Sequence, residues 1–183
     1  VFVVDVNGAP TVALGVNDVS LDQGYGTHDI DLTGAFVDPE GDAMSYSAVS
    51  SNPSMVSLSV LGNILTITEA GFGIADITVT ASDGSTLSVN TVFELDVNGA
   101  PTVATGVSDV FEDAGFGTRN VNLTGAFSDP EGDPLTYTAV SDNSSVVTVN
   151  VIANILTITE VSHGICNVIV TASDGSTLSV DDT

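Results

Sequence analysis

The sequence contains almost no cationic side chains. Of its 183 residues, 24 are Asp or Glu, whereas Arg119 is the one strong cation and lysine is absent, so the formal net charge is −23. Ion pairs within the chain cannot neutralise so many carboxylates, which must be solvated, screened by salt or held by metal ions. Nucleic acid is excluded as a partner because phosphate binding depends on Lys and Arg, and an anionic membrane surface is disfavoured for the same reason.

Tryptophan, cysteine pairs and long apolar runs are also missing. Cys166 is the single cysteine, so a disulfide within the chain is excluded, and the absence of Trp weakens any hypothesis of sugar stacking. No apolar run approaches the ~20 residues that span a bilayer, so we expect no membrane insertion. No window has helical periodicity, which predicts an all-β chain. The sequence opens within a strand pattern and without an initiator Met, so we interpret it as a processed or excised piece.

The chain does contain one long internal repeat. A shift of 91 residues aligns 6–92 with 97–183 without a gap, and 54 of those 87 positions are identical. The period predicts two units of about 91 residues, each large enough to bury its own core. The joint between them reads Asp-Val-Asn-Gly-Ala-Pro at 96–101 and has a copy at 5–10.

The repeat also predicts the domain boundaries. Residues 1–6 match 92–97, the expected last strand of the first unit. We therefore assign 1–7 to the last strand of a preceding unit or to a donor strand, 8–97 to the first repeat, and 98–183 to a second repeat that lacks its own last strand.

Within the first unit, the pattern predicts about seven short strands. We expect an edge strand over 11–21, behind a proline, and further strands over 28–32, 44–49, 55–60, 64–68, 74–81 and 86–95. Asp83-Gly84 lies between two alternating runs and predicts a hairpin with a type I′ turn, because that turn needs positive φ. Seven short strands in about 90 residues are typical of an antiparallel Greek-key β-sandwich.

Four motifs occur in a fixed order along the chain. They are the joint at 96–101, a segment at 110–118 that carries Glu112 ahead of Gly-Thr, the loop Asp-Pro-Glu-Gly-Asp at 129–133 that leads to Tyr137, and the strand end Val-Thr-Ala-Ser-Asp-Gly at 170–175. In this order they resemble the motifs of cadherin-like, Ig-like tandem repeat domains of bacterial or archaeal surface proteins. The resemblance covers essentially every residue of both units. It implies two tandem Ig-like (cadherin-like) antiparallel Greek-key sandwiches in an extracellular, cell-surface or filament protein.

The resemblance further implies calcium at the joints. Calcium binds six to eight oxygens from carboxylates, amides, backbone carbonyls and water. The acidic loop supplies three carboxylates whose repulsion is costly unless a cation lies among them or the loop keeps them hydrated and apart. This joint has Gly99 and Ala100 where animal cadherins have a further Asp and Asn, so we expect one ion per joint, or a solvated metal-free loop. The candidate ligands are Asp96, Asn98, Asp129, Glu131 and Asp133, completed by Asp22 or Glu69, with Asp5, Asn7, Asp38, Glu40 and Asp42 at the equivalent joint.

The remaining candidate residues give no catalytic pattern. His28 and His163 align with Arg119 and Phe72, so neither histidine belongs to the repeated plan, and both are predicted on the surface. No spacing of Ser, His and Asp suggests a nucleophile with its base. Other residues are predicted to be structural: Tyr46 and Tyr137 in or beside the core, and Cys166, opposite Ala75 in the alignment, as a small buried residue. We therefore predict that the protein is not an enzyme.

Two function classes remain. The favoured one is a structural repeat of an extracellular array or filament, with copies or adjacent repeats joined head to tail. The other is a carbohydrate- or protein-binding module of a secreted multidomain protein, which predicts an exposed aromatic cluster. For residues 1–6, two interpretations stay open: the chain is a window onto a longer array, or these residues complete the second sandwich of a neighbouring molecule by strand addition. Six extended residues span only ~20 Å, too short to serve the same molecule.

Overall fold

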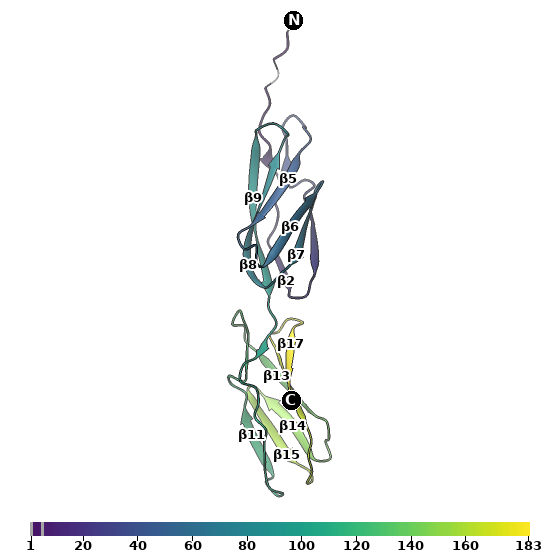
Figure 1. Cartoon of the computed structure of the whole chain (residues 1–183), viewed down its shortest axis with the longest axis vertical. Coiled ribbons are helices and arrows are strands. Elements are labelled where there is room, and N and C mark those ends of the chain that lie inside the picture. Colours follow the sequence, from purple (N-terminus) through teal and green to yellow (C-terminus); the bar gives the residue numbers. More distant parts are fainter. Residues whose placement is uncertain (1, 5) are drawn as a thin grey trace. The chain divides into compact units, whose positions relative to one another are not determined.

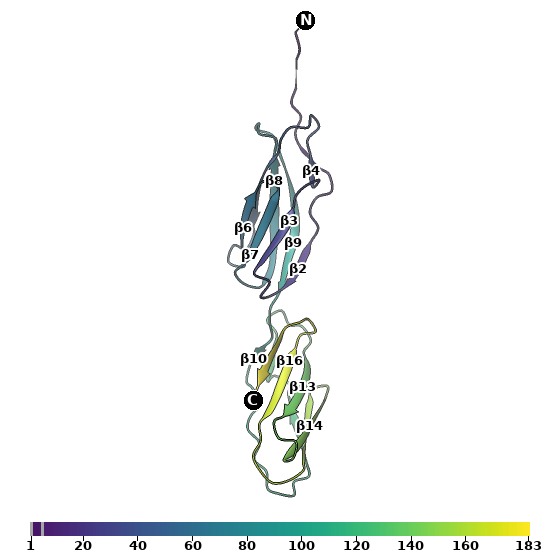
Figure 2. The same ribbon diagram turned by 90° about the vertical axis from the view of Figure 1, so that its right-hand side faces the viewer.

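A computed structural model describes residues 2–4 and 6–183, and all regular structure in that part of the chain is β-strand. The chain divides into two compact units, Val1–Asn98 and Gly99–Thr183. Figures 1 and 2 show that each unit contains two facing layers of strands. Within the described residues, no helix has the length and apolar character needed to cross a membrane.

The first unit is a sandwich of two main sheets. Its strands are β1 (Thr11–Val12), β2 (Val19–Asp22), β3 (Thr27–Asp31), β4 (Phe36–Val37), β5 (Ser45–Ser50), β6 (Val56–Leu61), β7 (Ile64–Glu69), β8 (Gly73–Ser82) and β9 (Ser88–Asn98). One sheet has the order β2-β9-β8-β5 and the other β3-β7-β6, while β1 pairs with β4. The pairings described for this unit are antiparallel, except that β2 runs parallel to β9. β9 therefore lies inside its sheet, between β8 and β2.

Alternating side chains of β8 and β9 build most of one wall of the core. Successive residues of a strand point to opposite faces, so every second residue is buried. In β9 these residues are Phe93, Leu95 and Val97, each at most 1% exposed, and they pack with the equally buried Ile77 and Val79 of β8. Elsewhere in this core, Phe36 contacts Tyr46 with ring centroids 5.8 Å apart.

The second unit repeats this plan in part. Its strands are β10 (Thr102–Val103), β11 (Thr118–Asn122), β12 (Phe127–Ser128), β13 (Thr136–Ser141), β14 (Val147–Ile152), β15 (Ile155–Glu160), β16 (Val168–Ser173) and β17 (Ser179–Asp182). The sheets have the orders β13-β16-β17 and β11-β15-β14, with β10 paired to β12. By the 91-residue period, β17 corresponds to only the first four residues of β9. Phe127 and Tyr137 repeat the ring contact at 5.8 Å, which confirms the predicted position of both tyrosines beside the core.

The sandwich predicted from the sequence is confirmed, and most predicted strands lie within three residues of the observed bounds. The predicted edge strand over 11–21 is wrong as a single element. It is divided into β1 and β2, which pair with different partners, and Gly15 with a φ of +69° separates them.

The Asp83-Gly84 hairpin is also confirmed, but its predicted type I′ turn is wrong. Ser82 pairs with Ser88, so the loop has five residues rather than two. A type I′ turn needs positive φ at both central residues. Here Gly84 has a φ of +87°, whereas Asp83 is not among the described residues with positive φ.

The segment before β1 forms no strand in its described residues 2–4 and 6, and predictions that involve Val1 or Asp5 lie outside the described residues. Its apolar side chains lie in solvent: Phe2, Val4 and Val6 are 86%, 71% and 76% exposed. The corresponding residues of β9, which are Phe93, Leu95 and Val97, are fully buried. The same apolar pattern is therefore buried in β9 and exposed in the segment before β1.

This difference predicts the effect of truncating the two aromatic residues. Phe93→Ala should lower the free energy of unfolding of the first unit by about 3–5 kcal/mol, because it removes a buried ring and leaves a cavity. Phe2→Ala, at the same repeat position, should change it by less than about 0.5 kcal/mol in dilute solution. Urea unfolding followed by circular dichroism measures both. Equal losses from the two variants would contradict the burial of Phe93.

Candidate functional site

The second unit has an open apolar groove at the place that β9 and β2 fill in the first unit. In the first unit, β9 pairs with β8 from Gly73 opposite Val97 onward, and residues 95–98 pair with β2. The corresponding residues of the second unit, 110–113 and 164–167, form no strand. Residues 110–113 and 164–167 correspond to the parts of β2 and β8 that pair with β9 in the first unit. The described residues of the second unit include no strand that lies between these two segments and pairs with both.

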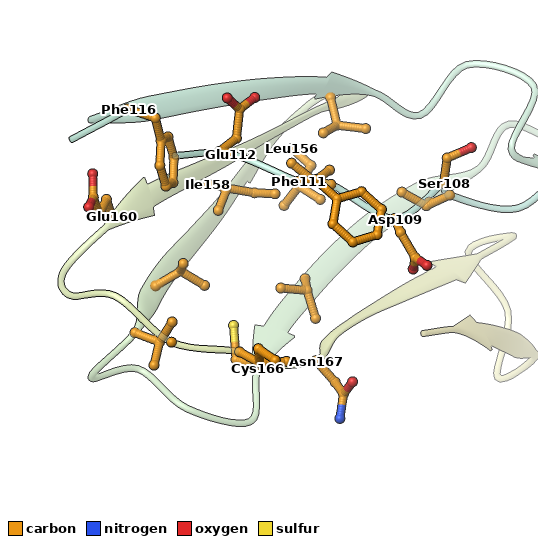
Figure 3. Close-up of a pocket in the computed structure, with 18 of the residues that line it drawn as sticks. Ser108, Asp109, Phe111, Glu112, Phe116, Leu156, Ile158, Glu160, Cys166 and Asn167 are labelled. Carbon is orange, nitrogen blue, oxygen red and sulfur yellow. The ribbon is translucent and has the colours of Figure 1, made fainter. Parts of the chain in front are cut away.

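The groove has a volume of about 600 Å³ and is lined mainly by core-type side chains, including Phe116, Leu156, Ile158 and Val168. Figure 3 shows Phe116, Ile158 and the sulfur of Cys166 directed toward the opening. Other apolar side chains near it lie in solvent: Phe111, Val161 and Ile165 are 88%, 55% and 95% exposed. The groove is therefore a continuation of the core that the described residues do not cover.

Cys166 differs from its prediction as a buried residue. Its counterpart Ala75 is 1% exposed and pairs with Leu95 of β9, whereas Cys166 is only half-buried and lines the groove. The alignment correctly predicted a small residue on the core face. The burial fails because no described strand covers the second unit at the position of β9.

The two acidic loops are held by their own backbone. Asp38 Oδ1 accepts hydrogen bonds from the backbone N–H groups of Glu40 and Asp42, each at 3.0 Å. Asp129 Oδ1 accepts three such bonds, from residues 131, 132 and 133, also at 3.0 Å. These donors stabilise the carboxylate charge without a cation.

A second carboxylate of each loop holds the segment that precedes the unit. Glu40 Oε2 accepts the backbone N–H of Gly8 at 3.0 Å, and Glu131 Oε2 accepts that of Gly99 at 3.1 Å. A Cβ at Gly8 would lie 3.0 Å from the Glu40 carboxylate, so a larger residue here would require the Glu40 side chain to shift by a few tenths of an ångström. In both copies of the Asn-Gly-Ala-Pro motif, the backbone of the glycine is therefore bound to the acidic loop.

Asp83 connects the β8–β9 loop to the preceding segment. It is 9% exposed; Oδ1 accepts hydrogen bonds from the backbone and hydroxyl of Ser85, and Oδ2 accepts one from Asn7 Nδ2 at 2.7 Å. The hydrogen bond from the Ser85 side chain is the main cause that holds the pKa of Asp83 below its ordinary value, with the Ser85 backbone and Asn7 adding to it. This role of Asp83 was not predicted from the sequence, where Asp83 was assigned only to a turn. The repeated Asp-Gly-Ser could have indicated it, since Asp accepts bonds from residues two positions on.

Glu69 binds the loop between β2 and β3. Its carboxylate accepts the backbone N–H groups of Gly24 and Gly26 at 2.7 and 3.0 Å. In the second unit Glu160 accepts those of Gly115 and Gly117, and these bonds lower its pKa. The sequence signal for this contact was the repeated Gly-x-Gly with a Glu 45 residues later.

Arg119 and the two histidines lie outside the core. Arg119 forms an ion pair with Glu112 at 3.2 Å, at an exposed position. His163 is exposed and His28 is partly exposed, so the predicted surface position of the histidines fits His163 more closely.

One atom of each acidic loop is left without a partner. Asp38 is 6% exposed, and its Oδ2 is buried and accepts no hydrogen bond. Asp129 Oδ2 is also buried and also accepts no hydrogen bond. Such an atom is costly unless water or an ion contacts it. Among the described residues, however, no three His, Cys, Asp or Glu side chains are grouped to hold a metal ion. Asp96 belongs to the first unit and Asp133 to the second, and Asp5 lies outside the described residues.

No protein-family model matches this sequence, and no curated protein matches it either. Solved structures match over nearly the whole chain. The human desmocollin-1 ectodomain has 15% identity and a TM-score of 0.53, with 97% of this chain and 36% of that one covered. The titin I-band fragment I67–I69 has 13% identity and a TM-score of 0.55, with 97% and 64% covered. The eight N-terminal Ig domains of Down syndrome cell adhesion molecule have 15% identity and a TM-score of 0.56, with 97% and 27% covered.

The chain has the Ig-like fold. At these identities the likeness concerns the fold alone, and this chain spans less than two thirds of each of those structures. It consists of two tandem Ig-like β-sandwiches, as the sequence predicted.

The contacts of Asp83 predict an acid-sensitive step in the first Ig-like unit. Because its folded pKa is lowered, its contribution to stability is present above the ordinary Asp value of about 4 and is lost as pH falls through the folded pKa. Asp83→Asn should flatten the pH dependence of the free energy of unfolding below about pH 4, while lowering stability at neutral pH. Asp76→Asn, at an exposed position of β8, is the control and should retain the dependence. Parallel pH profiles for Asp83→Asn and the unmodified chain would contradict this role.

Proposed function

We propose that this protein is a non-catalytic structural module of an extracellular array, in which Ig-like units are joined head to tail. The observation that carries the proposal is the tandem repetition of one sandwich whose polar groups hold loops and joints. Glu40, Glu131 and Asp83 each bind backbone or the adjacent segment rather than face a common pocket. The fold match to a desmocollin ectodomain and to a cell adhesion molecule supports an extracellular setting.

The location is tested on intact cells that produce the protein. Antibodies raised against the purified chain should label the cell surface or shed filaments, and external protease should release the antigen without lysis. Arg119 is the single residue of the chain after which trypsin could cleave, so a protease that cleaves at aliphatic residues is required. Antigen that appears only after lysis would contradict the proposal.

Calcium is a further part of this proposal. The unpartnered Oδ2 atoms of Asp38 and Asp129 fit a hard cation, which prefers carboxylate oxygen. At the first unit, Asn7, Asp38 and Glu40 lie in the segment and loop that the Gly8 contact joins, and Asp42 belongs to the same loop. A bound ion would supply the missing partner of Oδ2 and screen the carboxylates of the loop. The remaining proposed ligands are Asp96, Asn98, Glu131, Asp133, Asp22, Glu69 and Asp5.

Thermal unfolding tests calcium binding. Calcium at about 100 times its dissociation constant should stabilise a unit by about 2.7 kcal/mol, which raises Tm by roughly 10 °C or more for a domain of this size. Asp38→Asn keeps one oxygen for the loop N–H groups but replaces the other, so it should abolish the calcium shift of the first unit. Asp129→Asn should do the same for the second. Asp31→Asn, at the end of β3 in the first unit, is the matched control. The same shift in all three variants, or none in the unmodified chain, would contradict the site.

A binding module is the second candidate. It needs a cluster of exposed aromatic rings, and the most exposed ones in the described residues, Phe2, Phe72 and Phe111, belong to separate segments. Phe111 borders the groove of the second unit, and this groove suits an extended apolar segment better than a sugar. Glycan binding therefore has the weaker support.

A further inference from the structure

We infer that the open groove of the second unit binds residues 2–6 of a second copy of this chain as an added β-strand. The inference rests on the proposed head-to-tail association and names the segment, the acceptor and their register. It explains three features of the described residues together: an apolar groove without an occupant, two flanking segments without strand partners, and an apolar segment exposed to solvent.

The first unit shows what the groove accepts. Residues 92–97 lie there within the same chain, and residues 1–6 match them at four of six positions. Phe93, Leu95 and Val97 are each at most 1% exposed in their groove. Their counterparts Phe2, Val4 and Val6 alternate in the same way and are more than two thirds exposed. Alternate side chains in pockets and backbone hydrogen bonds along both edges are the usual means of strand addition.

The 91-residue period fixes the register of the added strand. In the first unit Val97, Leu95 and Phe93 lie opposite Gly73, Ala75 and Ile77. The donor therefore runs antiparallel to β16 and its extension.

The paired positions are Val6 with Gly164, Val4 with Cys166 and Phe2 with Val168. On its other edge the donor runs parallel to residues 110–113, as β9 does to β2.

Side-chain volumes agree with this register. Where the first unit pairs the large Leu95 with the small Ala75, the inferred contact pairs the smaller Val4 with the larger Cys166. The two changes compensate, and cores tolerate exchanges that conserve total volume. The half-buried state of Cys166 is then a property of the empty groove.

A hydrogen bond of the first unit also supports this register. Asp18 Oδ1 accepts the backbone N–H of Glu94 at 2.8 Å in the first unit. Its counterpart Asp109 borders the groove and is placed to accept the N–H of Val3. Val3 also replaces the carboxylate of Glu94, so the donor brings one charge fewer toward an acidic surface.

The segment is tied to the first unit at Asn7, which is bound to Asp83 and Ser85 in the loop that precedes β9. Beyond that contact, five extended residues reach at most about 18 Å. A second copy diffuses freely, so its segment reaches the groove without this limit.

Disulfide trapping tests the contact and its register. The donor is the full chain with Val4→Cys and Cys166→Ala, the second of which introduces the residue that the first unit already carries as Ala75. The acceptor is the unmodified chain, whose one cysteine is Cys166. Facing residues of an antiparallel pair have a Cα distance of about 4.5–5.5 Å, within the range that a disulfide bridges. The control donor carries Val3→Cys and Cys166→Ala, because Val3 matches the outward-facing Glu94.

In mild oxidant, the Val4→Cys donor should form a disulfide with Cys166 of the acceptor at least ten times faster than the Val3→Cys donor does. Non-reducing gels and mass spectrometry of the joined peptides measure the two rates, and circular dichroism confirms that each variant is folded. A chain with Val4→Cys that keeps Cys166 should form a ladder of linked chains. Equal rates for the two donors would overturn the register, and a disulfide within one monomer would overturn the second copy. If antibodies label the cell surface but no disulfide forms between Val4→Cys and Cys166, strand donation is refuted and the proposed function still holds.

Discussion

The core of each unit depends on its last strand. In the first unit β9 lies between β8 and β2 and places Phe93, Leu95 and Val97 over the core. The second unit is identical to the first at 54 of 87 aligned positions, but its residues 110–113 and 164–167 form no strand, and the groove opens along its core. The repeated segments thus differ in structure because one β-strand is present in the first unit and not in the described part of the second. This is the behaviour expected of a central strand, which satisfies backbone groups on both edges and covers one face.

A second constraint is the shortage of cations. With 24 carboxylates and one arginine, the chain cannot rely on ion pairs, and the structure shows carboxylates bound to backbone N–H groups instead. Asp38, Asp129, Glu69 and Glu160 all accept such bonds, and each of them holds a loop that leads into or out of the sandwich. The carboxylates therefore stabilise loops and joints through hydrogen bonds to nearby backbone, while the apolar side chains of the strands form the core. The remaining cost falls on the buried Oδ2 atoms of Asp38 and Asp129, which mark the positions where an ion or water is needed.

Most of the fold could be predicted because the alternation of apolar and polar residues marks the strands, and the 91-residue repeat gives the same strand order in both units. What failed depended on contacts distant in sequence. The type I′ turn was wrong because the Asp83 carboxylate binds Ser85 and widens the loop, and the 11–21 strand was wrong because its two ends join different sheets. Glu69 was assigned as a candidate ligand on the family resemblance, although a Gly-x-Gly that precedes a Glu by 43–45 residues in both repeats was a signal of its contact with Gly24 and Gly26. The exposure of Cys166 was missed although the sequence predicts a second repeat without its last strand, because its burial was inferred from the alignment with Ala75 and not from the strand that covers it.

The period that builds the two sandwiches also constrains how copies could join. A groove in the second unit and a segment before the first unit are different surfaces, so their contact is heterologous and does not close on itself as a two-fold dimer would. Because the donor has the sequence pattern of β9, the contact between copies would reproduce the packing of β9 within the first unit. The donor keeps phenylalanine and valine at the first and last buried positions and has Val4 in place of Leu95, opposite the one compensating change from Ala75 to Cys166. Neutral drift of an unused segment would not favour that compensation, whereas packing of the two side chains against each other would.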